Sequence, residues 1–95
     1  YQGVGKWLMI QYHEEMFHAM KLYGYLQDQG AAVELKAIAK PEFKETGIKE
    51  LFQHVLEHEK YVTKSIHEVM ALALEEKDYA TQVLIQWYVN EQVEE

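Results

Sequence analysis

The sequence predicts an all-α protein, a helical bundle of which three helices are present. In three separate segments, apolar residues recur at alternating spacings of three and four, which is the pattern of helices that pack side by side. A connection of about nineteen residues separates the first two segments, whereas a very short turn separates the second from the third. These features predict helices over about residues 5–29, 48–76 and 79–95, with a crossover over about 30–47.

The first helical segment carries two apolar stripes, so the helix needs more than one packing partner. Within one stripe, Glu15 and His18 form an E-x-x-H pair at positions where a bundle core is usually apolar. Isolated buried charges cost roughly several kcal/mol unless they are paired or bind a metal. Gly30 is expected to end the helix. The first stripe comprises Val4, Leu8, Gln11, Glu15, His18, Leu22 and Tyr25, and the second comprises Met9, Tyr12, Met16, Ala19, Tyr23 and Leu26.

The crossover is longer than a connection between antiparallel neighbours, which typically takes about 2–8 residues. It contains the only proline, Pro41, and an alternating segment over 33–38 that predicts extended backbone. Nineteen extended residues reach on the order of 60 Å, enough to run back along a 25-residue helix of ~37 Å. We therefore expect the first and second helices to be parallel, as in known bundles with a long crossover.

The second helix has a strict 3-4 register that is interrupted by one acid, Glu59. Thr46 is its predicted N-cap, and Asp78 is the predicted N-cap of the third helix. Because the turn before Asp78 is so short, the second and third helices are expected to be antiparallel neighbours. The register of the second helix comprises Phe52, Val55, Glu59, Val62, Ile66, Val69 and Ala73.

The third helix places polar residues toward the end of its packing face. That face carries Gln92 and Glu95, and Glu91 and Glu94 lie to either side of Gln92. Three helices therefore each carry an acid on the face that the apolar pattern turns inward. The complete face comprises Thr81, Ile85, Tyr88, Gln92 and Glu95.

Composition excludes several classes of function. The net charge is −7, and all nine cationic residues are lysine, which argues against a nucleic-acid partner because such surfaces favour arginine. No apolar run is long enough for a membrane span, so no membrane partner is expected. The absence of cysteine is compatible with the cytosol. The excess of acidic over basic residues indicates either a solvated surface or a surface that attracts cations.

The acids and the imidazole together predict a metal centre. Glu15 with His18, Glu59, and Glu95 with Gln92 combine carboxylates and an imidazole, which suit iron, zinc or manganese. Carboxylates that bridge ligand pairs suit a dinuclear site, and di-iron bundles use lone Glu residues together with E-x-x-H pairs. Neither a glycine-rich phosphate loop nor a nucleophile elbow is present, so hydrolase and nucleotide-binding functions have no support.

Four further histidines lie outside this constellation. His54 and His58 are four residues apart and could chelate a metal, but they lie off the Glu59 register, and we interpret them as surface or flanking residues. His13 and His67 are interpreted as surface residues.

Three stretches of the chain resemble prokaryotic non-haem ferritin. They are the run from Glu14 to Met20, the run from His58 to Thr63, and the W-Y-x-x-E-Q-x-E-E motif that ends at Glu95. The resemblance covers essentially the whole chain and implies a ferritin-like four-helix bundle whose second, third and fourth helices are present here. A second E-x-x-H on the last helix would indicate bacterioferritin, but Gln92 occupies its first position, so ferritin is favoured over bacterioferritin and rubrerythrin.

The family resemblance implies an iron-storage subunit with a di-iron ferroxidase centre. It implies that the subunit binds Fe(II), oxidises it with dioxygen or peroxide, and stores ferric mineral in a homo-oligomeric, cytoplasmic shell of two dozen subunits. By the same resemblance, Glu15 bridges two irons, His18 binds the first, Glu59 binds the second, and Glu95 binds beside the second with Gln92 nearby. An additional acidic metal site on the cavity side is implied for Glu14, Glu91 and Glu94.

The chain departs from the family because the family's first helix, which carries a further iron ligand, and the end of the fourth helix are absent. The stripe from Met9 to Leu26 is the wall that this leaves uncovered. Two alternatives to the iron-storage function remain. One is a non-catalytic helical assembly module whose acids are vestigial or structural. The other is another di-metal carboxylate oxidase of the same fold.

Overall fold

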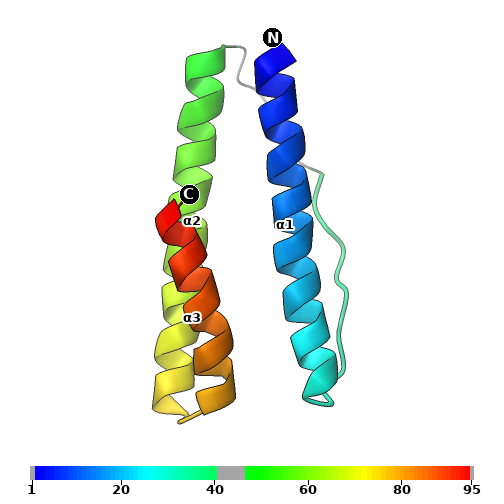
Figure 1. Cartoon of the computed structure of the whole chain (residues 1–95), viewed down its shortest axis with the longest axis vertical. Coiled ribbons are helices and arrows are strands. Elements are labelled where there is room, and N and C mark those ends of the chain that lie inside the picture. Colours follow the sequence, from blue (N-terminus) through cyan, green and yellow to red (C-terminus); the bar gives the residue numbers. More distant parts are fainter. Residues whose placement is uncertain (1, 41–46, 95) are drawn as a thin grey trace. The chain divides into compact units, whose positions relative to one another are not determined.

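The described part of the chain consists of α-helices and irregular segments. The computed structural model describes residues 2–40 and 47–94, which contain three helices and no strand (Figure 1). The helices are α1 (Gln2–Asp28), α2 (Ile48–Glu75) and α3 (Tyr79–Glu94). The chain divides into two compact units, Tyr1–Pro41 and Glu42–Glu95. The first unit contains α1, and the second contains α2 and α3.

Helix α1 begins at Gln2 rather than near residue 5, so Gly3 and Gly5 both lie within it. Glycine in a helix costs about 1 kcal/mol relative to alanine. The end of α1 is as predicted. Gly30 adopts a positive φ of 73°, its N–H donates to the Gln27 carbonyl at 3.0 Å, and the Ala31 N–H donates to the Leu26 carbonyl at 2.9 Å. These two bonds form a Schellman motif, which satisfies the last carbonyls of the helix.

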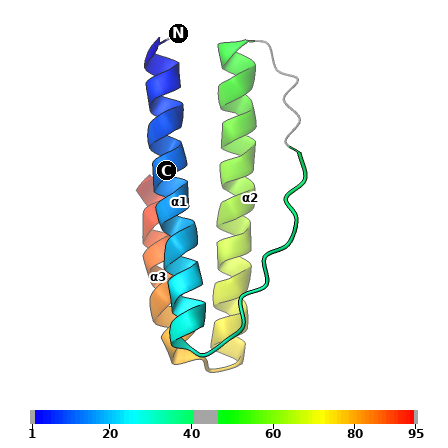
Figure 2. The ribbon, with the colours of Figure 1, turned by 90° about the vertical axis from the view of Figure 1, so that its right-hand side faces the viewer.

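The segment after Gly30 turns back and runs in the direction from which α1 came (Figure 2). Residues 31–40 are irregular, and the alternating segment over 33–38 forms no strand. Two large apolar side chains of this segment are highly exposed, Leu35 at 84% and Ile38 at 91%, whereas Val33 is half-buried. Pro41 and Thr46 lie outside the described residues. The N-cap of α2 is Gly47, which replaces the predicted Thr46 and makes no side-chain capping bond. The parallel arrangement of the first two helices stays a prediction.

Helices α2 and α3 pack against each other as an antiparallel pair, joined by a tight turn at residues 76–78 (Figure 1). The turn is a second Schellman motif, in which Lys77 occupies the left-handed position with φ 56° and the Asp78 N–H donates to the Ala73 carbonyl at 2.9 Å. Asp78 then caps α3 as predicted. One of its carboxylate oxygens accepts the Thr81 N–H at 3.1 Å, and the other accepts the Thr81 hydroxyl at 2.6 Å.

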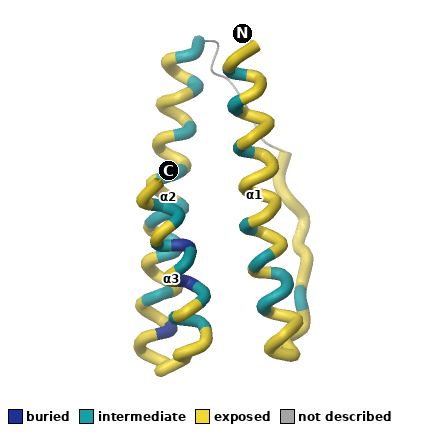
Figure 3. The backbone as a smooth tube through the Cα atoms, in the orientation of Figure 1, coloured by how far each residue is buried: buried dark blue, intermediate teal, exposed yellow. Residues whose placement is uncertain are grey.

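The core of the second unit lies between α2 and α3. Among the described residues, the most deeply buried side chains are Ala73, Ile85 and Tyr88, all on the predicted packing faces (Figure 3). Burying a side chain the size of Ile85 contributes about 1.5–3 kcal/mol. The register predicted for α2 is half-buried at Val55, Glu59, Val62 and Ile66, and exposed at Phe52 and Val69. This packing fixes the face of α2 on which Glu59 lies.

Candidate metal centre

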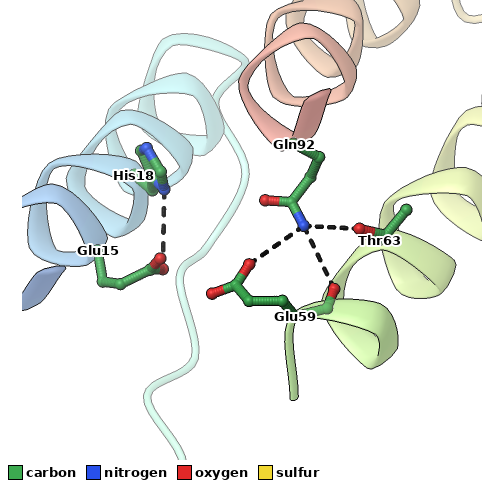
Figure 4. A network of polar contacts seen from close by, with 5 residues as sticks. All are labelled: Glu15, His18, Glu59, Thr63 and Gln92. Carbon is green, nitrogen blue, oxygen red and sulfur yellow. Dashed lines mark hydrogen bonds and ion pairs between the residues drawn. The ribbon is translucent and has the colours of Figure 1, made fainter. Parts of the chain in front are cut away.

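Glu15 and His18 form an acid–imidazole pair on α1. They are three residues apart on one face of the helix, and the His18 Nδ1 lies 3.7 Å from the Glu15 Oε2 (Figure 4). The His18 side chain is 14% exposed, whereas the Glu15 side chain is 55% exposed. The ring of Phe17 meets the His18 ring edge-on at 6.4 Å between centroids. The pair therefore combines an accessible carboxylate with a largely covered imidazole.

The stripe of α1 that contains this pair differs in part from its predicted course. Val4, Gln11, His18 and Tyr25 are half-buried as expected, but Leu8, Glu15 and Leu22 are exposed. Trp7 and Lys21 are half-buried in place of the two leucines. Because an α-helix has 3.6 residues per turn, either the third or the fourth residue along can continue a face. The spacing alone could not decide between them.

Gln92 links α3 to α2 beside Glu59 within the second unit. Its side-chain amide donates to the Thr63 hydroxyl at 2.7 Å and makes longer contacts of 3.4 Å with the Glu59 carbonyl and with Glu59 Oε2 (Figure 4). All these groups are partly buried. The amide thereby contacts Oε2 of the Glu59 carboxylate. Glu59 and Gln92, which were both predicted site residues, are therefore brought together.

Thr63 was not predicted as a site residue, although it lies one turn after Glu59 and the spacing could have indicated it. A cleft of ≈ 250 Å³ adjoins this network. Its walls combine a carboxylate, a cation, a hydroxyl, an amide and one apolar side chain. The lining residues are Leu56, Glu59, Lys60, Thr63 and Gln92. The cleft gives the Glu59 carboxylate access to small solutes.

The remaining predicted acids are distributed over two helices. Glu14 is exposed on α1, and on α3 Glu91 is half-buried and Glu94 is exposed. Glu95 lies outside the described residues. Over residues 2–40 and 47–94, no three His, Asp or Glu side chains form a group that could hold a metal ion. Within the described residues, each unit contains one pair of candidate residues: Glu15 with His18 on α1, and Glu59 with Gln92 between α2 and α3.

Tyr88 lies one turn before Gln92 on α3 and is 6% exposed. Burial raises the pKa of its phenol to about 12, because the charged phenolate is poorly solvated there. The Trp87 ring meets the Tyr88 ring edge-on, with 4.9 Å between centroids. The phenol therefore keeps its proton at neutral pH.

None of the described helices is both long enough and apolar enough to cross a bilayer.

Comparison with known protein families gives a match over residues 1–95 to the ferritin-like domain. A bacterial non-heme ferritin of Staphylococcus aureus is 37% identical over 95 residues, which is all of this chain and 57% of that protein. A probable bacterial non-heme ferritin-like protein of Haemophilus influenzae is 39% identical and is covered to 58%. The chain therefore spans little more than half the length of these relatives.

Solved structures give the same result for the fold. The open-pore ferritin of Archaeoglobus fulgidus is 45% identical, with a TM-score of 0.87 over 90% of this chain and 52% of that one. A humanized archaeal ferritin gives the same identity, TM-score and coverage. These matches confirm the all-α, ferritin-like fold and the family resemblance that the sequence motifs indicated.

Proposed function

The chain belongs to the ferritin-like domain family, and from this premise we propose that it forms part of an iron-storage ferritin subunit. The observation that carries the proposal is the Glu15–His18 pair, an E-x-x-H whose imidazole and carboxylate lie 3.7 Å apart on α1. The family match over all 95 residues supports the proposal. In the cell, we place the subunit in the cytoplasm, in accordance with the family resemblance.

We propose that the substrate of the site is Fe(II), held as a pair of ions. Glu15 bridges the ions, His18 and Glu59 each bind one of them, and Glu95 binds beside the second. These roles follow from the match of the motifs to the family. Glu14, Glu91 and Glu94 form an additional acidic metal site in the same proposal. Carboxylates and imidazole are the ligands that suit iron.

The proposed reaction is oxidation of the bound iron. Each Fe(II) gives up one electron to become Fe(III), and dioxygen accepts the two electrons of a pair together with two protons, which yields hydrogen peroxide. Peroxide is an alternative oxidant. The anionic side chains of Glu15 and Glu59 stabilise the more highly charged product over the reactant, because Coulomb attraction grows with ionic charge. They thereby favour oxidation.

Gln92 and Thr63 are positioning residues in this proposal. The Gln92 amide holds one Glu59 oxygen at 3.4 Å and is itself held by Thr63 at 2.7 Å. A carboxylate whose rotamers are restricted loses less side-chain entropy when it binds a cation. The arrangement therefore prepares Glu59 for metal binding.

A homo-oligomeric shell that stores ferric mineral is the second half of the proposal. The second apolar stripe of α1 supports it, because Met9, Tyr12 and Met16 are 57%, 57% and 47% exposed. Exposed apolar patches of this kind mark interaction surfaces. The same stripe also favours the alternative of a non-catalytic assembly module, so the two functions must be separated by the chemistry of iron.

Stopped-flow oxidation of Fe(II) tests the proposal. Fe(II) is first added to the parent chain without oxygen, and the mixture is then combined with dioxygen. The bound Fe(II) is expected to oxidise rapidly. Glu15→Ala removes the proposed bridging carboxylate and is expected to slow the fast phase by on the order of a hundredfold or more. Loss of a residue that only supports a metal ligand typically lowers metal affinity or activity about 10–100-fold, so loss of a ligand itself should cost at least as much.

The matched control is Glu68→Ala, which removes an exposed carboxylate of α2 that lies nine residues after Glu59. This control is expected to oxidise iron at the parent rate. Equal rates in the parent, Glu15→Ala and Glu68→Ala would refute the site assignment. A parent chain that binds no iron but still oligomerises would favour the assembly module.

A further inference from the structure

An exposed pair of histidines lies on the side of α2 away from the Gln92 network. His54 and His58 are four residues apart within the continuous helix Ile48–Glu75, and both are exposed. None of the roles proposed above uses either residue. Their spacing matters because imidazole is the commonest protein ligand for transition-metal ions.

Helix geometry places the two imidazoles side by side. Residues i and i+4 lie on one face, separated by a rise of ~6 Å and with Cβ atoms about 5–6 Å apart. Two histidines at this spacing on a helix form a chelating pair, as in the H-E-x-x-H zinc motif. Because α2 is already helical, the backbone needs no rearrangement for an ion to bind between the rings.

The surroundings of His54 are anionic, and the His58 ring has an aromatic neighbour. A hollow of ≈ 320 Å³ beside His54 is lined by Lys49, Glu50, Gln53, His54 and Glu57, so two carboxylates outweigh one ammonium. The His58 ring lies against the Tyr61 ring at 6.4 Å between centroids. Excess negative charge attracts a divalent cation.

The pair is separate from Glu59, the proposed iron ligand on the same helix. Adjacent helical residues point about 100° apart around the axis, so Glu59 faces away from His58. Accordingly, Glu59 is half-buried beside Gln92 of α3, whereas His58 is exposed. An ion bound by His54 and His58 would not share a ligand with the network in Figure 4.

We propose that His54 and His58 form a second, mononuclear site that binds a divalent transition-metal ion of the Cu²⁺, Ni²⁺ or Zn²⁺ type. The two imidazoles are the protein ligands, and water completes the coordination. Imidazole suits these ions, with Cu²⁺ expected to bind most tightly. Glu50 and Glu57 raise the local cation concentration. The site is independent of iron oxidation, so it stands or falls separately from the proposed function.

Titration with Cu²⁺ tests the site in the full chain. Electron paramagnetic resonance of the parent at substoichiometric Cu²⁺ is expected to show two nitrogen ligands. His54→Gln and His58→Gln are each expected to remove the two-nitrogen signal and to weaken binding by at least on the order of 10–100-fold. Both positions are exposed and glutamine is a good helix former, so the variants should fold.

Comparison of single and double variants distinguishes chelation from independent binding. A chelate predicts that the double variant binds no more weakly than either single variant, because each substitution already destroys the site. The matched control is His67→Gln on the same helix, which removes an exposed imidazole with no histidine three or four residues away. It is expected to leave the signal unchanged. Two-nitrogen binding that persists in His58→Gln, or additive losses, would overturn the proposal.

Discussion

At the scale of single residues, one amide connects the packing of the second unit to its candidate site. Gln92 donates at 2.7 Å to the Thr63 hydroxyl, and this short bond holds the amide where it also contacts Glu59 Oε2 at 3.4 Å. A bond between partly buried neutral groups contributes about 0.5–1.5 kcal/mol. The pairing of α2 with α3 and the placement of the Glu59 carboxylate therefore depend on the same contact.

Thr63→Val is expected to destabilise the chain by about 1 kcal/mol, because valine keeps the shape of threonine but cannot accept the Gln92 bond. Urea unfolding followed by circular dichroism measures the change. Thr63→Ser, which keeps the hydroxyl, is the conservative control and is expected to lie closer to the parent. A valine variant as stable as the parent would show that the Gln92 amide gains nothing from Thr63.

The contrast between Glu59 and Thr63 shows what residue patterns reveal about the site. Glu59 was predicted because an acid interrupts an apolar register, which is costly without a partner. Thr63 was missed because a threonine on a helix is ordinary, and its role depends on the reach of Gln92 from another helix. Whether Glu15, His18, Glu59 and Glu95 share one site stays a prediction.

At the scale of elements, the helix ends are held by local chemistry that sequence rules describe well. Gly30 and Asp78 were predicted as the end of one helix and the start of another, and both are confirmed. Lys77 is less favourable, because a left-handed residue with a Cβ costs about 1–2 kcal/mol. The start of α2 was not foreseen, since Gly47 occupies the N-cap without a side-chain bond.

Acid titration of the Asp78 cap is expected to weaken α3. The two bonds from Thr81 hold the pKa of the Asp78 carboxyl below its usual value, because they stabilise the charged form. A folded-state pKa below the unfolded value means that the unfolded chain binds more protons. The resulting stability is present above the unfolded pKa of about 3.9 and is lost as the pH falls through the lowered folded-state value.

Asp78→Asn separates the cap from its charge. Asparagine is as good an N-cap as aspartate but does not titrate, so this variant is expected to keep the helix content of the parent at neutral pH. The part of the acid sensitivity that comes from the Asp78 carboxylate should be absent in this variant. Asp78→Ala is expected to lose helix content even at neutral pH. Circular dichroism from neutral pH down to acid measures both effects, and identical acid profiles for the parent and Asp78→Asn would contradict the assignment.

At the scale of the whole molecule, the chain has more apolar surface than its described helices cover. It spans 57% of the Staphylococcus aureus relative, and no residue of α1 is classed as buried. The fold class and the packing faces of α2 and α3 followed from 3-4 spacing, because those helices cover each other. The same spacing predicted the packing faces of α1 less accurately. Its half-buried positions include Trp7 and Lys21, which the spacing did not predict.

The exposed stripe of α1 predicts self-association of the chain. Tyr12 and Met16 are 57% and 47% exposed on one face, and burying apolar surface of this kind against another copy contributes about 25 cal/mol per Å². Tyr12→Glu with Met16→Glu places two charges on that surface, where burial would be costly. The double variant is expected to have a smaller native mass than the parent by light scattering, with unchanged helix content.

The control for this prediction must add the same charge elsewhere on α1. His13→Glu with Gln27→Glu does so at two exposed polar positions, and it is expected to keep the native mass of the parent. A fall in mass for both double variants would trace the effect to net charge, which is already −7, and not to the stripe. An unchanged mass in the Tyr12 and Met16 variant would show that copies of the chain associate through other surfaces. Only a loss specific to that variant supports the stripe as a contact between copies of the chain.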